Sequence, residues 1–289
     1  MVSGKCFKQY VERMVGVGHL RKLAEVLFVE KENFYFCNHK KAIKNPDSSP
    51  ASEYLGEEHP GLRCKSTNKM QGSKQFFEKV FSTKRMERYF ALYPDDEAKA
   101  IAHYECNLML SESLYTSLSV MEVTLRNALC RELETMTGRE DWYAIFPTTP
   151  GLRSLNRYIT EASQHITARR EQITPSKIVA ELTLGFWVSL LNSEYERTLW
   201  HALRRAFPYM PRQERQRKNV STPLNLFRRF RNRVFHNESI CWNLDRVEEI
   251  HDEMLKVIGW MNCDLPEWVK EQERFDEVCV EIRKRMGWE

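Results

Sequence analysis

Apolar residues recur along most of this chain at three- and four-residue steps, the spacing of an amphipathic helix. The longest such stretch runs from Asp96 to about Met136. Its apolar positions are Ile101, Tyr104, Leu108, Tyr115, Leu118, Leu125 and Leu129. They fall on one stripe, so the pattern predicts a long helix with one buried face. A shorter apolar group over 76–81 predicts a helix before it.

Capping residues and prolines divide the rest of the chain into further helices. Gly138 ends the long stretch, and a helix is expected over 152–171. Thr174 followed by Pro175 is a helix start, because threonine caps the first N–H groups and proline suits the first turn. The segment 184–191 is almost wholly apolar, which indicates central burial. A further helix is expected from Tyr195 to Phe207.

The C-terminal third repeats these signals. Ser221-Thr222-Pro223 is again a cap followed by proline and predicts the start of a helix that continues to about His236. Asn243 is expected to cap the last strong helix, whose apolar face continues to Met261. A shorter helix is predicted from Glu267 to Met286. The fold class that follows is all-α.

The first part of the chain has a different pattern. Helical spacing over 7–29 is interrupted by two glycines and gives way to Asn45-Pro46-Asp47-Ser48-Ser49-Pro50, a loop sequence. We therefore expect three regions: an N-terminal extension of uncertain order over 1–73, a helical domain over 74–262, and a C-terminal helical tail over 263–289.

Composition adds limits to this picture. The 289 residues suffice for a substantial core, no apolar run approaches a membrane span, and the N-terminus lacks the apolar core of a secretory signal. A cytoplasmic protein without membrane contact is expected. The eight cysteines contain no Cys-x-x-Cys pair and are expected to be reduced and mostly buried. A zinc site formed by Cys37, His39, His59 and Cys64 is a weaker alternative, so no metal and no cofactor is predicted.

Charge is concentrated in one window. From Arg204 to Arg233 the chain has ten Lys or Arg and one acid, Glu214, a net charge of +9. The whole chain is +4, so the remainder is about −5. Such a basic segment suits contacts with RNA phosphates, which do not depend on sequence. The residues predicted to make them are Arg204, Arg205, Arg215, Arg217, Lys218, Arg228, Arg229 and Arg233.

Within this window lies Arg231-Asn232-Arg233-Val234-Phe235-His236. Histidine transfers protons near neutral pH, and arginine neutralises a phosphate, so the pair can act on an RNA phosphodiester. Arg231 and His236 differ by roughly 140° on an ideal helix, a gap that a long arginine spans. Asn237 allows the helix to end at His236. Asn232 is predicted to orient His236 or to bind the phosphate.

Glu122 falls within the stripe of the long helix, with Arg126 four residues later and Asn127 beside it. Residues four apart meet on one helix face, so Glu122 and Arg126 can form an ion pair that makes partial burial tolerable. The alternative is a surface pair that contributes a few tenths of a kcal/mol. We regard Glu122, Arg126 and Asn127 as residues that support the site.

Four short motifs suggest a family. They are Glu122-Val123-Thr124-Leu125-Arg126-Asn127, then Trp142-Tyr143, then Ser176-Lys177-Ile178-Val179-Ala180-Glu181-Leu182 with Gly185-Phe186-Trp187, and last the Arg231–His236 motif. Their order over residues 76–261 resembles the Abi-like abortive-infection proteins of the HEPN superfamily. Those proteins often have a second histidine after the motif histidine, where this chain has Asn237.

The resemblance implies a bundle of long antiparallel helices and a homodimer. It also implies, for active members, a metal-independent ribonuclease with one composite site between two chains. Some such proteins are phage-defence toxins or work with a small noncoding RNA. The expected function is therefore endoribonuclease, with Arg231, His236 and Asn232 as catalytic residues. Two alternatives stay open: a nuclease-inactive partner of a small noncoding RNA, and a helical module that binds only proteins.

Overall fold

The computed structural model describes residues 73–288, and every regular element in this range is helical. The predicted all-α class is confirmed. These residues belong to one compact unit, and the predicted extension, with its possible zinc ligands, lies outside the described residues except for Ser73. Between residues 73 and 288, no helix has the length and apolar character needed to cross a membrane.

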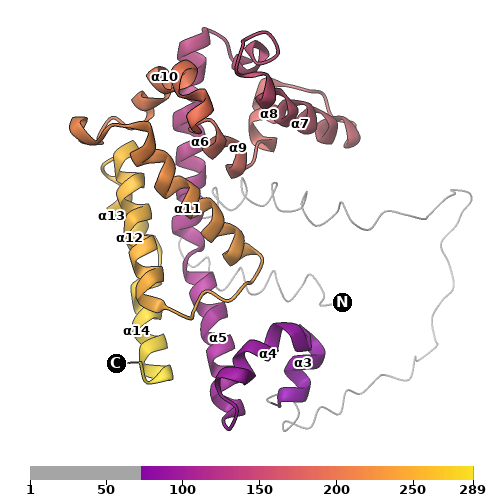
Figure 1. Ribbon diagram of the computed structural model, residues 1–289, viewed down its shortest axis with the longest axis vertical. Helices are drawn as coiled ribbons and strands as arrows, with labels where there is room; N and C mark the ends of the chain where they lie inside the picture. The colour runs from indigo at the N-terminus through magenta and orange to yellow at the C-terminus, as the bar shows by residue number, and fades with distance from the viewer. Residues whose placement is uncertain (1–72, 289) are drawn as a thin grey trace, which may run out of the picture. The chain divides into compact units, whose positions relative to one another are not determined.

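The long predicted helix is two helices, α5 (Glu97–Ser113) and α6 (Tyr115–Thr137), which follow each other in Figure 1. The break falls at the buried Leu114. Serine hydroxyls on both sides donate back to backbone carbonyls: Ser113 to Leu110 over 2.9 Å and Ser117 to Leu114 over 3.1 Å. Such bonds compete with the helical ladder and bend helices. Gly138, with φ 69°, ends α6 as expected.

Helix α6 is the centre of the core. It packs against α12 (Leu244–Met261), α9 (Leu184–Ser189) and the short α10 (His201–Leu203). Helix α11 (Arg217–Phe235) lies against α9 and α12. The remaining helices of this part are α7 (Asn156–Ala168) and α8 (Pro175–Glu181), with Thr174 capping α8 as predicted. One continuous set of buried side chains joins all these elements.

Residues 265–286, which the sequence set apart as a tail, form α13 (Leu265–Gln272) and α14 (Phe275–Met286). Val269, Phe275 and Ile282 are buried in the main core, and α14 lies along α5. At the other end, α3 (Lys74–Phe81) and α4 (Thr83–Leu92) pack on the start of α5 in a second, smaller core. This small core includes Tyr89 and Tyr104.

The predicted start of α11 at Ser221 is wrong. The helix begins at Arg217, so Pro223 lies in its interior, where its ring nitrogen cannot donate to the Asn219 carbonyl. The Arg217 guanidinium bonds the Ser221 hydroxyl and the Leu191 carbonyl, each over 3.0 Å, and Val220 is fully buried. These tertiary contacts hold a first turn that the capping signal does not predict. Asn243, by contrast, caps α12 as expected.

Candidate functional site

The C-terminal end of α11 presents the Arg231–His236 motif. Phe227, Phe230 and Val234 are buried on one face of the helix, so the polar residues between them face outward. Helix α11 ends at Phe235, and His236 is its C-cap with an exposed side chain. The His236 N–H donates to the Asn232 carbonyl over 2.9 Å. The backbone therefore links these two predicted site residues, and the Asn232 side chain is exposed.

Asn237 gives the end of α11 its form. Its φ is 51°, in the left-handed region that asparagine tolerates better than most residues. The Asn237 N–H donates to the Val234 carbonyl, and the Glu238 N–H to the Arg233 carbonyl, over 3.0 and 2.9 Å. These two bonds form a Schellman motif, which ends a helix by turning the chain sharply away. Asn237, the departure from the Abi-like pattern, thus places His236 at the last helical turn.

Arg231 is held on two sides. Its Nε is 3.4 Å from Oε2 of Glu122 on α6, an ion pair without the alignment of a hydrogen bond. The guanidinium carbon lies 4.4 Å from the centre of the Phe235 ring, a cation–π contact, and Tyr115 lies beside that ring at 6.2 Å. The Arg231 side chain is still 32% exposed. Its position is therefore fixed while part of it faces solvent.

Glu122 thus contacts a residue that the sequence placed in a different motif. The sequence predicted a pairing of Glu122 with Arg126, one turn along α6. The structure also places Glu122 beside Arg231, more than a hundred residues later in the chain. Arg126 is half-buried and Asn127 is exposed. The first and last motifs of the resemblance consequently meet in space.

The loop after the motif is anchored by Asn107, which sequence reasoning missed. Asn107 is fully buried on α5, and its Oδ1 accepts from the backbone N–H groups of Ile240 and Cys241, over 2.7 and 3.1 Å. Its Nδ2 reaches the Glu238 carbonyl at 3.4 Å. The signal in the sequence was a polar residue three positions after Tyr104, on a stripe that is otherwise apolar.

His103 holds the same loop one turn earlier on α5. Its Nε2 lies 2.9 Å from the Cys241 carbonyl, an acceptor, so Nε2 carries the proton and donates. The rings of Tyr89, Tyr93, Trp242 and Trp288 surround it with centroids 4.6 to 5.8 Å away. Burial lowers the pKa of His103 because the charged imidazolium loses water. His103 is therefore a neutral structural residue.

Three of the arginines predicted to contact RNA are each held by two or more polar groups of the protein. Arg215 donates to the carbonyls of Pro208 and Met210, both over 2.8 Å. Arg217 donates to the Glu196 carboxylate, the Leu191 carbonyl and the Ser221 hydroxyl. Arg233 donates to the Ser239 carbonyl over 2.5 Å and pairs with Glu238. Their contacts with RNA stay predictions. Within the fold, each of these arginines bonds at least one backbone carbonyl.

The other predicted RNA contacts are more open. Arg204, Lys218 and Arg229 are exposed, and Arg205 is exposed and paired with Glu132 over 2.9 Å. Arg228 is close to Gly185 of α9: a Cβ added at Gly185 would lie 4.0 Å from the Cδ of Arg228.

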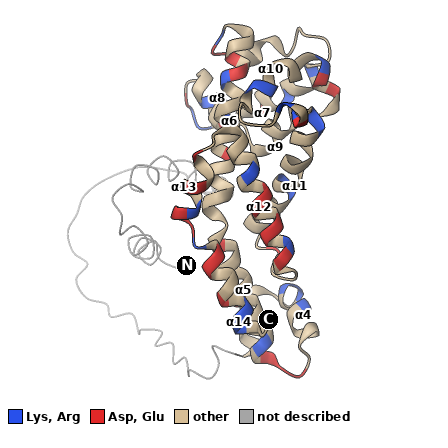
Figure 2. Ribbon diagram, turned by 90° about the vertical axis from the view of Figure 1, so that its left-hand side faces the viewer, with Lys and Arg blue, Asp and Glu red and all other residues tan. Residues whose placement is uncertain are grey.

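The neighbouring helices α11 and α12 carry opposite charges. Helix α11 has six basic residues and no acid. Helix α12 has five acids and two bases, and the acids colour it red in Figure 2. The basic surface is therefore formed by α11 and the turns before it, and it does not extend onto α12.

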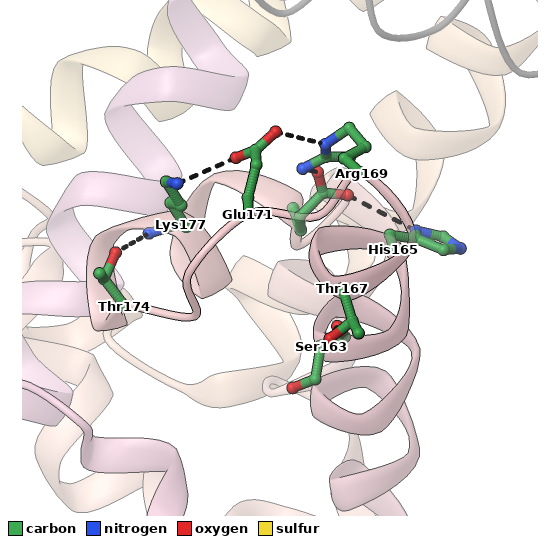
Figure 3. A network of polar contacts seen from close by, with 8 residues as sticks. Ser163, His165, Thr167, Arg169, Glu171, Thr174 and Lys177 are labelled. Atoms are coloured by element: carbon green, nitrogen blue, oxygen red, sulfur yellow. Dashed lines mark hydrogen bonds and ion pairs between the residues drawn. The ribbon is translucent and has the colours of Figure 1, made fainter.

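The middle motifs of the resemblance have structural roles. Trp142, Phe186 and Trp187 are fully buried together, with Trp142 and Phe186 stacked at 6.1 Å. Figure 3 shows a polar network between α7 and α8, in which Lys177 pairs with Glu171 over 3.0 Å. In the same network Arg169 contacts both Glu171 and Glu181, joining α7 to α8. Among the described residues, these side chains contact one another and the core, and none of these contacts is with the Arg231–His236 motif.

Most of the described cysteines are buried or half-buried, and the described residues contain no group of metal ligands. Cys106, Cys241 and Cys279 are buried, as expected. Burial raises the pKa of the Cys241 and Cys279 thiols to about 12, so they stay protonated. Within residues 73–288 no three His, Cys, Asp or Glu side chains are grouped as metal ligands would be.

Comparison with known proteins gives no relative for this chain: no family model matches the sequence, and no curated protein or solved structure matches it. The Abi-like family therefore stays a resemblance carried by the four motifs.

Proposed function

We propose that this protein is an endoribonuclease of the Abi-like type, which cleaves RNA without metal at a site formed by Arg231 and His236. The observation that carries the proposal is the end of α11. Arg231 is held by Glu122 and Phe235, and the Schellman turn sets an exposed His236 at the end of the same helix. A cation held in place on the same last turns of a helix as an exposed imidazole is suited to a phosphodiester.

The proposed reaction is attack of an RNA 2′-hydroxyl on the neighbouring phosphorus, giving a 2′,3′-cyclic phosphate and a 5′-hydroxyl end. His236 removes or supplies the proton, and Arg231 stabilises the charge that develops on the phosphate oxygens. Asn232 is exposed within the same turn, where it can contact the phosphate. The exposed Arg204, Lys218 and Arg229 bind flanking phosphates.

The site calls for two chains. Each chain supplies one His236, and cleavage requires both a base and an acid, so a homodimer with two facing motifs provides the pair. Light scattering at micromolar protein should give twice the 34.4 kDa chain mass. A fully active protein that stays monomeric at all concentrations would contradict the two-chain site.

A second candidate is a nuclease-inactive partner of a small noncoding RNA. The observation in its favour is that Arg231 already has Glu122 as a partner. Both candidates use the same basic surface and predict RNA bound to the purified protein. They differ in whether cleavage depends on His236.

The decisive experiment is His236→Ala, with His201→Ala as the matched control, because His201 is also exposed but lies on α10. Single-turnover cleavage of a labelled RNA, in buffer with EDTA, should fall about 10²-fold or more in His236→Ala, the usual contribution of a general acid–base. RNA affinity should change little in either variant. Equal cleavage by His236→Ala and wild type would move the inactive-partner function to first place, and loss of cleavage in EDTA alone would indicate a metal enzyme.

A further inference from the structure

A second basic feature lies near the opposite end of α11. It is a surface hollow of about 350 Å³ lined by Arg204, Arg205, Arg212 and Arg215. Arg204 and Arg205 come from the 3₁₀ turn Arg204–Ala206 that follows α10, and Arg212 comes from the 3₁₀ turn Arg212–Glu214. The Arg231–His236 motif begins 14 residues after Arg217, the first residue of α11, which is about 21 Å along the helix at 1.5 Å per residue.

The four guanidinium groups are only partly neutralised. Glu132 of α6 pairs with Arg205 and is the one acid that joins them among the contacts of the described residues. Glu214 follows on the same turn as Arg212 but does not line the hollow. Arg204 and Arg212 are exposed, and neither has a side-chain partner within residues 73–288. Four positive charges against one negative leave the hollow at +3.

The hollow is also fixed in place. Two bonds from Arg215 to the Pro208 and Met210 carbonyls fasten one wall. Phe207 and Met210 are buried in the core, and the Tyr209 N–H donates to the Trp260 carbonyl of α12 over 3.0 Å. A wall that is ordered before binding avoids part of the entropy cost of binding. Positive charges held close together repel one another, and an anion bound between them would relieve this repulsion.

From these observations we propose that the hollow is a binding site for a compact polyphosphate, two or three phosphates in a row. Only arginines line it, so no aromatic or aliphatic wall among the described residues is offered to a base. Its volume is at the low end for ligand sites, roughly 300 to 1,000 Å³. One phosphomonoester carries about −1.5 to −2 at neutral pH, which leaves part of the +3 unmatched, whereas a short chain of phosphates balances it.

Such a group has two sources, the 5′-triphosphate end of an RNA and a free nucleoside triphosphate. Isothermal titration with inorganic tripolyphosphate, at 150 mM salt and without Mg²⁺, tests the shared chemistry. We expect binding at least tenfold tighter than that of sulfate. Competition experiments then identify the source. They compare a short 5′-triphosphate RNA with GTP, and the same RNA with a 5′-hydroxyl is the control. The source is whichever of the two triphosphates displaces tripolyphosphate at the lower concentration.

The test variant is Arg204→Ala/Arg212→Ala, since neither side chain has a structural partner in the described part of the chain. Its control, Lys79→Ala/Lys84→Ala, removes the same charge from exposed positions of α3 and α4, which the proposed function does not use. The test variant should lose at least tenfold in tripolyphosphate affinity, and the control should change less than threefold. Equal losses in the two variants, or tripolyphosphate binding no tighter than sulfate, would overturn the proposal.

Binding of tripolyphosphate is measured without any cleavage step, so failure of this site is distinguishable from failure of the ribonuclease. His236→Ala should bind tripolyphosphate like wild type, whether or not the wild type cleaves RNA. If His236→Ala abolishes cleavage while tripolyphosphate does not bind, the ribonuclease stands and the polyphosphate site falls.

Discussion

The two ends of α11 use arginine in different ways. At the C-terminal end Arg231 and Arg233 are matched by Glu122 and Glu238, and an aromatic ring lies under Arg231. Near the N-terminal end Arg204 and Arg212 line a hollow in which Glu132 is the one acid paired with a lining arginine, as far as the described residues extend. The difference shows that one basic window holds two kinds of arginine, those paired with acids of the fold and those that face solvent without an acidic partner among the described residues.

The C-terminal end also depends on a distant clamp. Asn107 and His103 on α5 hold the loop that leaves His236, and the Tyr89 hydroxyl lies 2.8 Å from that of Ser239 in the same loop. At the other end the turns are held by the Arg215 side chain and by the bond from the Tyr209 N–H to the Trp260 carbonyl of α12, and none of these bonds involves α5. Changes on α5 should therefore affect the two ends unequally, which can be measured.

The largest effect is expected from breaking the clamp with Asn107→Ala. This change leaves the buried N–H groups of Ile240 and Cys241 without an acceptor, at a cost of about 2–4 kcal/mol in the free energy of unfolding. Asn127→Ala, the same change at an exposed position of α6, should cost less than about 0.5 kcal/mol. Urea unfolding measures both.

The clamp variant also tests the comparison itself. Where Asn107→Ala is still folded, His236-dependent cleavage should fall while binding of tripolyphosphate at the distant hollow stays at its wild-type value. A parallel loss of both activities would mean that the two ends are not separate sites.

A pair of matched changes on α6 sharpens the comparison. Glu122→Gln frees Arg231 from its ion pair, so cleavage should fall about tenfold, the effect of misplacing one charge at a reacting phosphate. Glu132→Gln frees Arg205 instead and should raise tripolyphosphate affinity about two- to threefold without changing cleavage. Both pairs are partly exposed, so stability should change by less than about 1 kcal/mol. Identical effects of the two changes would argue against distinct roles.

The smallest effect is a pH dependence at the clamp. Burial lowers the pKa of His103, so the unfolded chain takes up a proton near pH 6.5 while the folded protein resists it. The free energy of unfolding should therefore fall as pH drops below about 6.5, and His103 contributes no pH dependence above that value. His103→Gln keeps a donor for the Cys241 carbonyl and should reduce the dependence of the unfolding free energy on pH. His165→Gln, at an exposed position, should not change it. An unchanged slope in His103→Gln would remove His103 as the cause.

Apolar periodicity and capping residues determined much of this protein. They predicted the all-α class, the cap of α8 at Thr174, the end of α6 at Gly138 and the full length of α12, because these features depend on residues within a turn or two of each other. The basic window and the end of α11 near His236 could also be predicted, because they too depend on residues close together in the chain. The ribonuclease itself stays a prediction from the motif and its resemblance.

Tertiary structure alone decided which distant side chains meet. Glu122 lies beside Arg231, not only near its helical neighbour Arg126, and Asn107 fastens a loop more than 130 residues away. It also decided the early start of α11, where burial of Val220 outweighs a proline in the helix interior. Of the basic residues, it separated those bonded within the fold, Arg215 and Arg217, from the open Arg204 and Arg212. Local spacing encodes the helices, but contacts between helices depend on how their apolar faces pack, which no single segment specifies.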